Sequence, residues 1–364
     1  MKAHLRANLF LLVFTVVVCC VLYPAVMYAV GRGLFPTAAS GSLITEPGPD
    51  GKDVVKGSRL IAQPFTSDEY FWSRPSAASY NATASGASNW GANNPKLRDR
   101  VSQFLGPIVQ YKKNSRFYTG ADLEKTVQKD IEVWFAAKPD RVADWAGEFD
   151  LAVGNWAKTD FAAKTDTSDE KYGLQGEFIL AWVKGHPEVI SDWKAANPTK
   201  TDDPKPEDLA AGFFASFAKT HPGKWPGVVD VEQPDKTKVK RIEPVSSDSA
   251  ISANLFELWL RDPANATRVA DLEPVAADMV MASGSGLDPD ITLRNALSVY
   301  QLDRVAKART APGADGKKVR DDITALVKKR AFTPLGGLVG EPLVNVLEVN
   351  RELDANFPVP APSK

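Results

Sequence analysis

The sequence is poor in the residues that most enzymes use for chemistry. Its 364 residues include only 2 Cys and 3 His. The two cysteines, Cys19 and Cys20, are adjacent inside an apolar run, and no thiol follows them. This scarcity argues against a disulfide framework, a thiol nucleophile and a Cys/His metal site. We therefore expect no catalytic residue, no metal ligand, no firmly bound cofactor and no enzyme activity of the chain alone.

An excess of charge of either sign is also lacking. Lys and Arg together number 44 and Asp and Glu 45, which gives a formal net charge of −1. Because nucleic-acid binding needs a basic surplus on at least one face, we expect no nucleic-acid partner. Hydrophobic residues make up 44% of the chain, which is enough for a folded core.

One long apolar segment stands near the N-terminus. The run from Leu9 to Val30 has no charged residue, and as a helix rising about 1.5 Å per residue it can cross a membrane. We predict a transmembrane helix over residues 9–34. A cleaved signal peptide is the alternative, although its apolar region is usually shorter, about 7–15 residues. Lys2 and Arg6 precede the run, so the positive-inside tendency predicts a cytosolic N-terminus.

The remaining sequence predicts a mixture of strands, loops and helices. Residues 41–64 pair two β-prone runs around a turn rich in Pro and Gly, which predicts a β-hairpin. Residues 64–95 combine Ser, Asn, Gly and Pro with aromatic anchors, and such a long loop is typically functional or part of an interface. Further elements are predicted as helices at 96–104, 292–309 and 315–329 and a strand at 343–349.

Residues 107–270 differ in character, because they hold seven of the nine Trp. The spacing of Trp134, Pro139 and Trp145 recurs later in the same region at Trp182, Pro187 and Trp193. This repeat predicts pairs of short helices, each with a proline near the start of the second helix. The tryptophans can hold small helices together or form an aromatic binding platform, and the sequence leaves both interpretations open.

The segment SGSGLDP, residues 283–289, is the sharpest local motif. Its density of Ser and Gly predicts a turn with exposed backbone N–H groups, which can bind an anion or a carbonyl of a partner. Alternatively it is a simple turn that leads into the next element. No His follows it, so a Ser-His-Asp hydrolase is not expected.

Seven blocks follow the apolar segment in a fixed order. They read GSLI (41–44), GSRLIAQPF (57–65), YFWSRPSAASYN (70–81), SGASNWGANNP (85–95), ASGSGLDPDI (282–291), YQLDRVAKAR (300–309) and GEPLVNVLEVN (340–350). In this order they resemble the KdpC family, the C chain of the bacterial high-affinity potassium-transporting ATPase. The resemblance covers about residues 1–106 and 271–354. Small departures from the family pattern occur at Ala87, Trp90 and Asp290.

The resemblance implies an accessory subunit without catalytic residues. Its partners would be a channel-like potassium subunit, a P-type ATPase subunit and the lipid of the bacterial inner membrane. The family is also described as a catalytic chaperone that raises the ATP affinity of the ATPase subunit, so ATP would reach this chain only through that partner. The glutamine implicated in nucleotide binding corresponds to Gln301. Because the predicted topology places Gln301 outside the cytosol, nucleotide contact and this topology are competing expectations.

The predicted fold class is α+β, with one transmembrane helix and an extracytoplasmic α+β domain interrupted by an all-α Trp-rich insertion. The expected boundaries are 1–8 for the cytosolic N-terminus, 9–34 for the helix, 35–106 and 271–354 for the KdpC-like domain, 107–270 for the insertion and 355–364 for a tail. Candidate partner contacts, or alternatively residues that brace the core, are Arg74, Tyr80, Asn81, Asn89, Ser283, Ser285, Asp288 and Arg304. The alternative function is a membrane-anchored extracytoplasmic binding or scaffold module that uses the insertion.

Overall fold

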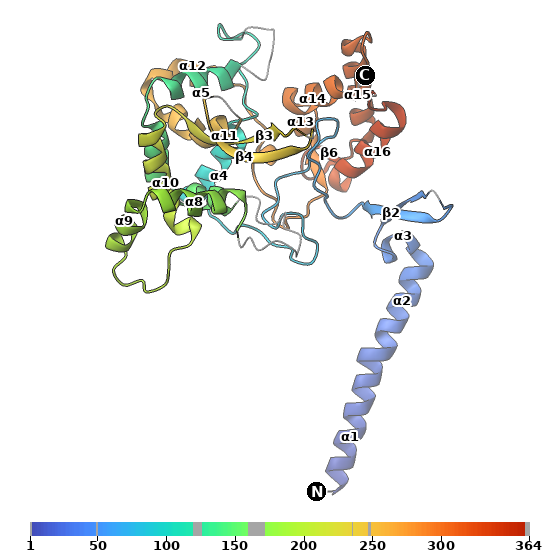
Figure 1. Ribbon diagram of the computed structural model, residues 1–364. Coiled ribbons are helices and arrows are strands. Elements are labelled where there is room, and N and C mark those ends of the chain that lie inside the picture. The colour runs from blue at the N-terminus through green and yellow to red at the C-terminus, as the bar shows by residue number, and fades with distance from the viewer. Residues whose placement is uncertain are drawn as a thin grey trace. The chain divides into compact units, whose positions relative to one another are not determined.

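The structure is a computed structural model that describes residues 2–48, 50–118, 126–158, 172–234, 236–246 and 249–360. Its contacts divide the chain into two compact units. The first unit consists of residues 1–88 and 276–364, and the second consists of residues 89–275. Each unit is described by itself, with the element labels of Figure 1.

The first unit begins with a long apolar helix. α1 (Lys2–Val16) continues through a π-helical stretch (Val17–Leu22) into α2 (Tyr23–Leu34), and Figure 1 shows them as one continuous rod. The span His4–Leu34 has a mean hydropathy of 2.7, and its side chains are not buried by the rest of the protein. In the described part of the chain, this is the one helix that is long and apolar enough to cross a membrane.

A β-hairpin follows the short helix α3 (Pro36–Ala39), as the sequence predicts. β1 (Leu43–Pro47) and β2 (Asp53–Ser58) pair antiparallel, with a register irregularity between Ile44 and Thr45. The hairpin is tied to the end of the helical segment, because the Ser58 hydroxyl donates a hydrogen bond to the Gly41 carbonyl at 2.7 Å.

The body of the first unit is a small α+β layer. β5 (Asp290–Thr292) and β6 (Leu343–Asn345) form a two-stranded antiparallel sheet. α15 (Gly316–Arg330) and α16 (Val346–Asn356) pack on it around fully buried apolar side chains such as Val327. The shorter elements of this unit are η4 (Ala277–Met279), α13 (Leu293–Ala296), η5 (Val299–Asp303), α14 (Arg304–Arg309) and η6 (Pro334–Gly337).

Two predictions about this unit are wrong in detail. The helix expected over 292–309 is interrupted, because Ser298 has an extended backbone and its hydroxyl accepts the N–H of Gln301, which starts a new helix. The strand expected over 343–349 ends at Asn345. The Asn345 side chain accepts the N–H of Glu348 at 3.2 Å and thereby caps α16.

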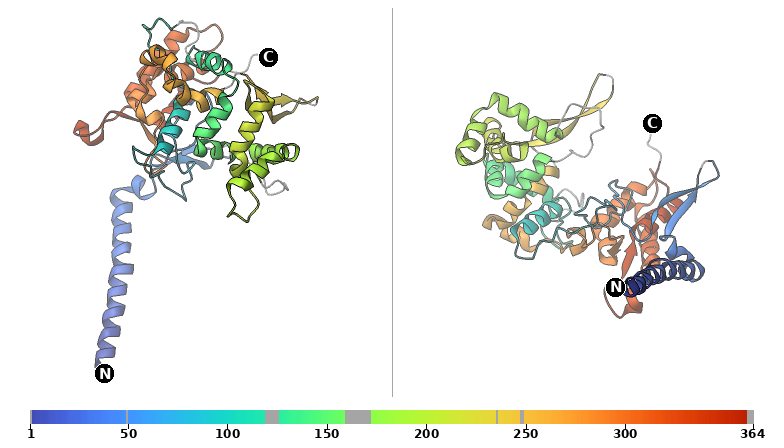
Figure 2. Two further views of the ribbon diagram at one scale, coloured as in Figure 1. Left: turned by 90° about the vertical axis from the view of Figure 1, so that its left-hand side faces the viewer. Right: turned by 90° about the horizontal axis from the view of Figure 1, so that it is seen from below.

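The second unit is mainly helical and is organised around α10 (Pro206–Thr220). α10 contacts four other helices, and its Phe213, Phe214 and Phe217 are completely buried. Figure 2 shows these helices in green and yellow-green from two directions. Within its described residues, the helices of this unit besides α10 are α4 (Pro95–Leu105), α5 (Thr126–Ala136), α6 (Arg141–Glu148), α7 (Asp150–Lys158), α8 (Leu174–Gly185), α9 (Glu188–Ala196), α11 (Ser249–Arg261), η3 (Pro263–Asn265) and α12 (Ala266–Ala270).

The prediction that residues 107–270 are all-α is wrong. β3 (Trp225–Glu232) and β4 (Lys238–Val245) form an antiparallel hairpin with an uninterrupted register. Val and Ile residues in both strands favour this conformation because β-branched side chains suit a pleated surface. The hairpin is anchored by Trp225, which is completely buried and lies 4.9 Å from Trp145 between ring centroids.

The helix-proline-helix repeat is present, and its tryptophans mostly serve packing. α5 and α6 flank Pro139, and α8 and α9 flank Pro187. Trp145 is 1% exposed and packs in the same apolar cluster as α10, while Trp182 and Trp193 pack against that cluster from its edge. Four ring contacts that tryptophans make in this cluster are edge-on, the arrangement that ring quadrupoles favour.

The predicted domain boundaries at 107 and 270 lie inside the second unit and stay a prediction. Between them the backbone of the flanking residues is paired, because the Lys112 N–H donates to the Asp271 carbonyl and the Glu273 N–H donates to the Gln110 carbonyl. The predicted tail 355–364 overlaps the end of α16, and its last four residues lie outside the described residues.

Candidate functional site

The structure brings several predicted contact residues together where the segment 64–88 meets the turn 283–289. The Arg74 guanidinium donates to the Asp288 carboxylate at 3.0 Å. Both side chains keep about a third of their surface in solvent, 27% for Arg74 and 32% for Asp288. The second Asp288 oxygen accepts the N–H of Asp290 at 3.2 Å. This ion pair is therefore placed to brace the turn and still reach a partner.

Tyr80 is a bracing residue in the same loop. Its hydroxyl donates to the Arg74 carbonyl at 2.8 Å, and its N–H donates to the Ser76 hydroxyl at 2.9 Å. Ser76 in turn donates to the Gly286 carbonyl at 2.6 Å. Burial raises the pKa of the Tyr80 phenol, so the hydroxyl stays protonated and remains a donor. The loop is thereby fixed to the turn through side chains on both sides.

Several backbone groups of the turn at 283–289 are paired within the first unit. The N–H of the buried Ser283 donates to the Pro75 carbonyl at 3.2 Å, and the Ser285 hydroxyl accepts the Leu287 N–H at 3.1 Å. Gly286 has φ of +69°, and a Cβ atom there would lie 2.8 Å from a backbone oxygen of the neighbouring loop. Three N–H groups of the motif, those of Ser283, Gly286 and Leu287, are thus paired within the chain, which favours the simple turn.

Asn81 and Asn89 stand in local turns of the chain. Asn81 is exposed, and its side-chain oxygen accepts the N–H of Thr83 at 3.0 Å, which is an Asx turn. Asn89 is also exposed, adopts φ of +53° and is the first residue of the second unit. Asn tolerates this left-handed conformation better than most residues. The geometry gives both residues a local turn-forming role.

Gln301 is buried and fully hydrogen-bonded. Only 4% of its surface is exposed. Its carbonyl oxygen accepts the Trp72 N–H at 3.1 Å and an Arg304 N–H at 2.7 Å. Its amide nitrogen donates to the Trp72 carbonyl at 3.1 Å and to the Asn295 side chain at 3.2 Å. An amide has two donors and one oxygen with two lone pairs, so every hydrogen-bonding position of Gln301 is in use.

Arg304 binds the same loop a few residues before Trp72. Its guanidinium donates to the carbonyls of Ser67 and Asp68, at 3.2 Å and 2.9 Å. It also lies over the Trp72 ring, 4.0 Å from the centroid, which adds a cation–π contact. The residue is 6% exposed, so its charge is directed into the protein and not toward a partner.

Two residues that the sequence did not identify complete this arrangement. Asn350 accepts the Phe71 N–H and donates to the Phe71 carbonyl, both at 2.9 Å. Arg309 donates to the Glu69 carbonyl at 2.7 Å. Asn350 lies among apolar side chains on the buried face of α16. A polar residue at an otherwise apolar position was the sequence feature that could have identified it. We call Gln301, Arg304, Arg309 and Asn350 the loop clamp.

The side chains of the loop clamp make the backbone hydrogen bonds that a neighbouring β-strand would otherwise make. Gln301 and Asn350 each pair both backbone groups of one residue, Trp72 and Phe71 respectively, as a neighbouring strand would do. The clamp therefore gives an irregular segment a defined shape. Asp290 at the edge of this unit is also paired, with Asn345 at 3.0 Å, and burial raises the pKa of Asp290.

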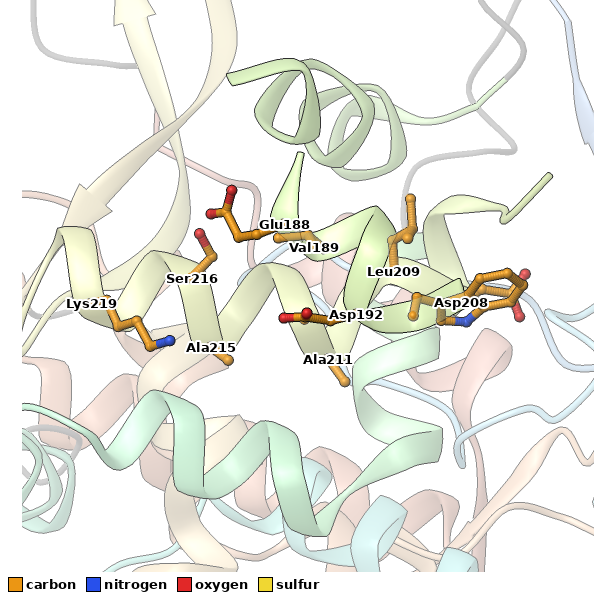
Figure 3. Close-up of a pocket in the computed structure, with 11 residues that line it drawn as sticks. Glu188, Val189, Asp192, Asp208, Leu209, Ala211, Ala215, Ser216 and Lys219 are labelled. Atoms are coloured by element: carbon orange, nitrogen blue, oxygen red, sulfur yellow. The ribbon is translucent and has the colours of Figure 1, made fainter. Parts of the chain in front are cut away.

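The described residues contain no group of three or more His, Cys, Asp or Glu side chains placed to hold a metal ion. In the second unit, a groove of about 230 Å³ lies between α9 and α10 (Figure 3). Figure 3 shows Glu188, Asp192 and Lys219 along it, so its wall carries both signs of charge. At its floor Gly212 lets the helices approach, since a Cβ there would meet Val189 at 2.9 Å.

Comparisons with known proteins identify the relatives of this chain. The family model described as "K+-transporting ATPase, c chain" matches residues 5–140 and 236–355, which is more than half of the chain. The match thus leaves out residues 141–235.

Curated relatives carry the same family name. The "Potassium-transporting ATPase KdpC subunit" of Burkholderia cenocepacia is 41% identical over 134 residues, which is 36% of this chain and 63% of the relative. The protein of that name from Burkholderia mallei is 35% identical over 188 residues, 49% of this chain and 90% of the relative. A relative of the same name in Burkholderia pseudomallei matches to the same extent, 35% over 188 residues. The chain belongs to the KdpC family, the c chains of K+-transporting ATPases.

Proposed function

We propose that the chain is a non-catalytic accessory subunit of an ATP-driven potassium transport complex. The family match over residues 5–140 and 236–355 is the observation that carries this proposal. The shortage of thiols and histidines agrees with it, because a subunit whose partners carry out transport and hydrolysis needs no reactive side chains of its own. Its partners would be a channel-like potassium subunit, a P-type ATPase subunit and membrane lipid.

The proposed topology is a single-pass protein of the bacterial inner membrane. Lys2 and Arg6 before the helix support a cytosolic N-terminus, which would place the bulk of the chain outside the cytosol. A thiol-labelling experiment tests this. With Cys19 and Cys20 replaced by Ser, a single cysteine at Lys317→Cys should react with a membrane-impermeant reagent added outside intact inner-membrane spheroplasts. Labelling only after lysis would contradict the topology.

The loop clamp suggests how such a subunit stabilises a complex. It fixes the segment 67–72, and the ion pair Arg74–Asp288 beside that segment keeps polar atoms in solvent. We propose that this part of the first unit is the partner-facing surface. A rigid loop loses little conformational entropy on binding, which favours a stable assembly.

We propose that the chain affects the ATP affinity of the ATPase subunit without binding ATP itself. A nucleotide that touched Gln301 would have to replace hydrogen bonds to Trp72, Arg304 and Asn295. Breaking them would leave buried polar groups without partners, which is costly. We therefore propose that ATP stays in the ATPase subunit and that Gln301 affects it only by shaping the surface that meets that subunit.

The alternative function places the activity in residues 107–270. It is supported by the groove between α9 and α10 and by the extent of the family match, which leaves out residues 141–235. The paired backbone at Lys112 and Asp271 offers a site for deleting residues 113–270, nearly all of this region, because a short Gly-Ser turn can join the two residues. Potassium-dependent growth that survives the deletion would favour an accessory insertion; loss of growth with an intact complex would favour the alternative.

A complementation experiment tests the main proposal. The full chain is expressed in a strain that lacks its own subunit of this family but retains the partner subunits, and growth is measured at limiting potassium. We expect growth to be restored. The matched control is a chain without residues 2–34, which lacks the membrane helix and should not restore growth.

A further inference from the structure

An uncharged loop of the first unit exposes large apolar side chains. Residues 331–340, AFTPLGGLVG, join α15 to β6 and contain no charged residue. Leu335 is 75% exposed, Leu338 86% and Val339 62%. The two leucines are more exposed than any large apolar side chain of the N-terminal helix, where the highest value is 73% at Phe10. Contiguous exposed apolar residues of this kind mark an interaction site.

The loop has a fixed conformation. Its base is closed by two backbone hydrogen bonds between Phe332 and Leu343, at 2.9 and 2.8 Å. Leu335 has φ of +49° and ψ of +37°, a left-handed conformation that is unfavourable for a bulky residue. Gly336 and Gly337 continue the turn with positive φ. In Figure 2, left, the orange-red loop projects as a hook from its unit. The loop thus keeps its leucines exposed to solvent even though one of them, Leu335, has an unfavourable backbone conformation.

A positive charge flanks the apolar tip. Lys328 and Lys329 lie in the last turn of α15, both exposed, and within the described residues neither has an ion-pair partner. Arg330 next to them is paired with Glu352. On the other side of the loop stands a single acid, Glu341. Exposed apolar side chains beside unpaired lysines are the combination by which peripheral segments bind an anionic lipid surface.

A series of short contacts connects the base of the loop to the segment that follows the N-terminal helix. The hairpin that follows the helix is bonded to Gly41 through Ser58, at 2.7 Å. One residue later the Arg59 carbonyl accepts the Asn345 side chain at 3.0 Å. Asn345 ends the same strand, β6, that begins at Leu343 beside Phe332. These contacts therefore link the base of the loop to the segment that follows the N-terminal helix.

We propose that residues 331–340 form a second membrane contact, in which Leu335, Leu338 and Val339 enter the interface of the bilayer. Lys328 and Lys329 would face the anionic phosphates of phospholipids such as phosphatidylglycerol. The contact orients the first unit on the membrane that its helix already crosses. The proposal requires only the anchored chain and does not depend on a role in potassium transport.

Depth-dependent quenching tests the contact in the full chain. Cys19 and Cys20 are replaced by Ser, and an environment-sensitive fluorophore is attached at Leu338→Cys, or at Lys317→Cys as the exposed control on the opposite end of α15. Each protein is reconstituted into vesicles of phosphatidylcholine with or without phosphatidylglycerol, doped with lipid that carries a quencher high on its acyl chain. We expect at least threefold stronger quenching at position 338 than at position 317.

A charge variant separates the two contributions. In the Leu338→Cys background, Lys328→Gln with Lys329→Gln should reduce quenching in vesicles that contain phosphatidylglycerol and change it little in pure phosphatidylcholine. Equal quenching at positions 338 and 317 would overturn the proposal. So would shielding of position 338 that arises only when the pump subunits are added, because the occupant would then be protein. The comparison of positions 338 and 317 uses vesicles without pump subunits, so a negative result in it leaves the proposed function untouched.

Discussion

The loop clamp predicts a local change in backbone protection when Gln301 is truncated. Gln301→Ala removes the acceptor of the Trp72 N–H and the donor to the Trp72 carbonyl. A buried polar group that loses its partner costs about 1–3 kcal/mol. Trp72 is only half-buried, so water can replace part of the loss, and we expect the opening free energy of this amide to fall by about 2 kcal/mol. At 1.4 kcal/mol per factor of ten, its exchange with solvent should accelerate roughly 30-fold.

Hydrogen exchange of the full chain in detergent or a nanodisc, resolved to peptides that cover residues 65–74, measures this effect. Asn350→Ala is the matched variant, because it removes the same pair of bonds from Phe71 and should accelerate that amide more strongly than that of Trp72. Gln103→Ala is the control, since it loses only one partly buried bond at 3.3 Å in the second unit.

Two results would refute this reasoning. If Trp72 exchanges at the same rate in Gln301→Ala and in the unchanged protein, Gln301 does not hold the loop. If Gln301→Ala and Asn350→Ala accelerate the same amides equally, the two side chains act on the global stability of the unit and not on neighbouring residues.

The remaining predictions concern stability and pH. Glu257 is 5% exposed, and burial together with the neighbouring Asp99 carboxyl raises its pKa to about 7. Between pH 4.5 and pH 7, approximately, folded Glu257 therefore keeps a proton that the unfolded state releases. The free energy of unfolding should fall by up to about 3 kcal/mol as the pH rises through that range. In urea titrations Glu257→Gln should flatten this slope, and an unchanged slope would contradict the assignment. Gly286→Ala should lower the free energy of unfolding in urea titrations by about 1–3 kcal/mol. The added Cβ would lie 2.8 Å from the Gly86 carbonyl oxygen, at a backbone φ of +69°. A variant more stable than the unchanged protein would contradict the described turn.

Elements with local signals could be predicted from the sequence. The hairpin β1–β2 follows from two β-prone runs around a Pro- and Gly-rich turn, and α4 follows from Asn94-Pro95, where the Asn94 side chain accepts the Lys96 N–H at 3.0 Å. The clustering of Arg74, Tyr80 and Asp288 could be expected only through the family resemblance, since they are brought together by contacts between distant segments.

The predictions for two other segments were wrong because each segment carries two competing sequence patterns. Residues 343–349, LVNVLEV, are rich in Val and Leu as many strands are. However, Asn345 with Glu348 three residues later is an N-cap pattern, and here the helix that it caps forms instead of a longer strand. Around Ser298 the apolar period of a helix continues across a break that a serine cap creates. In both cases one side-chain hydrogen bond decides where the helix starts.

The loop clamp could not be predicted at all from local pattern. Gln301 and Asn350 lie far from residues 71 and 72 in the sequence, with separations of 229 and 279 residues. Their role follows from burial, because each sits where neighbouring positions are apolar, and a buried amide must find partners. What those partners are is decided by the tertiary fold.

Co-purification tests the central claim most directly. The full chain, carrying an affinity tag at its C-terminus, is purified in mild detergent from membranes of its own source cells grown at limiting potassium, and ATP hydrolysis is measured with and without potassium. The account predicts a complex with a P-type ATPase subunit and a channel-like subunit whose ATP hydrolysis rises when potassium is added. A chain that elutes as a monomer, with no potassium-stimulated hydrolysis associated with it, would contradict the account.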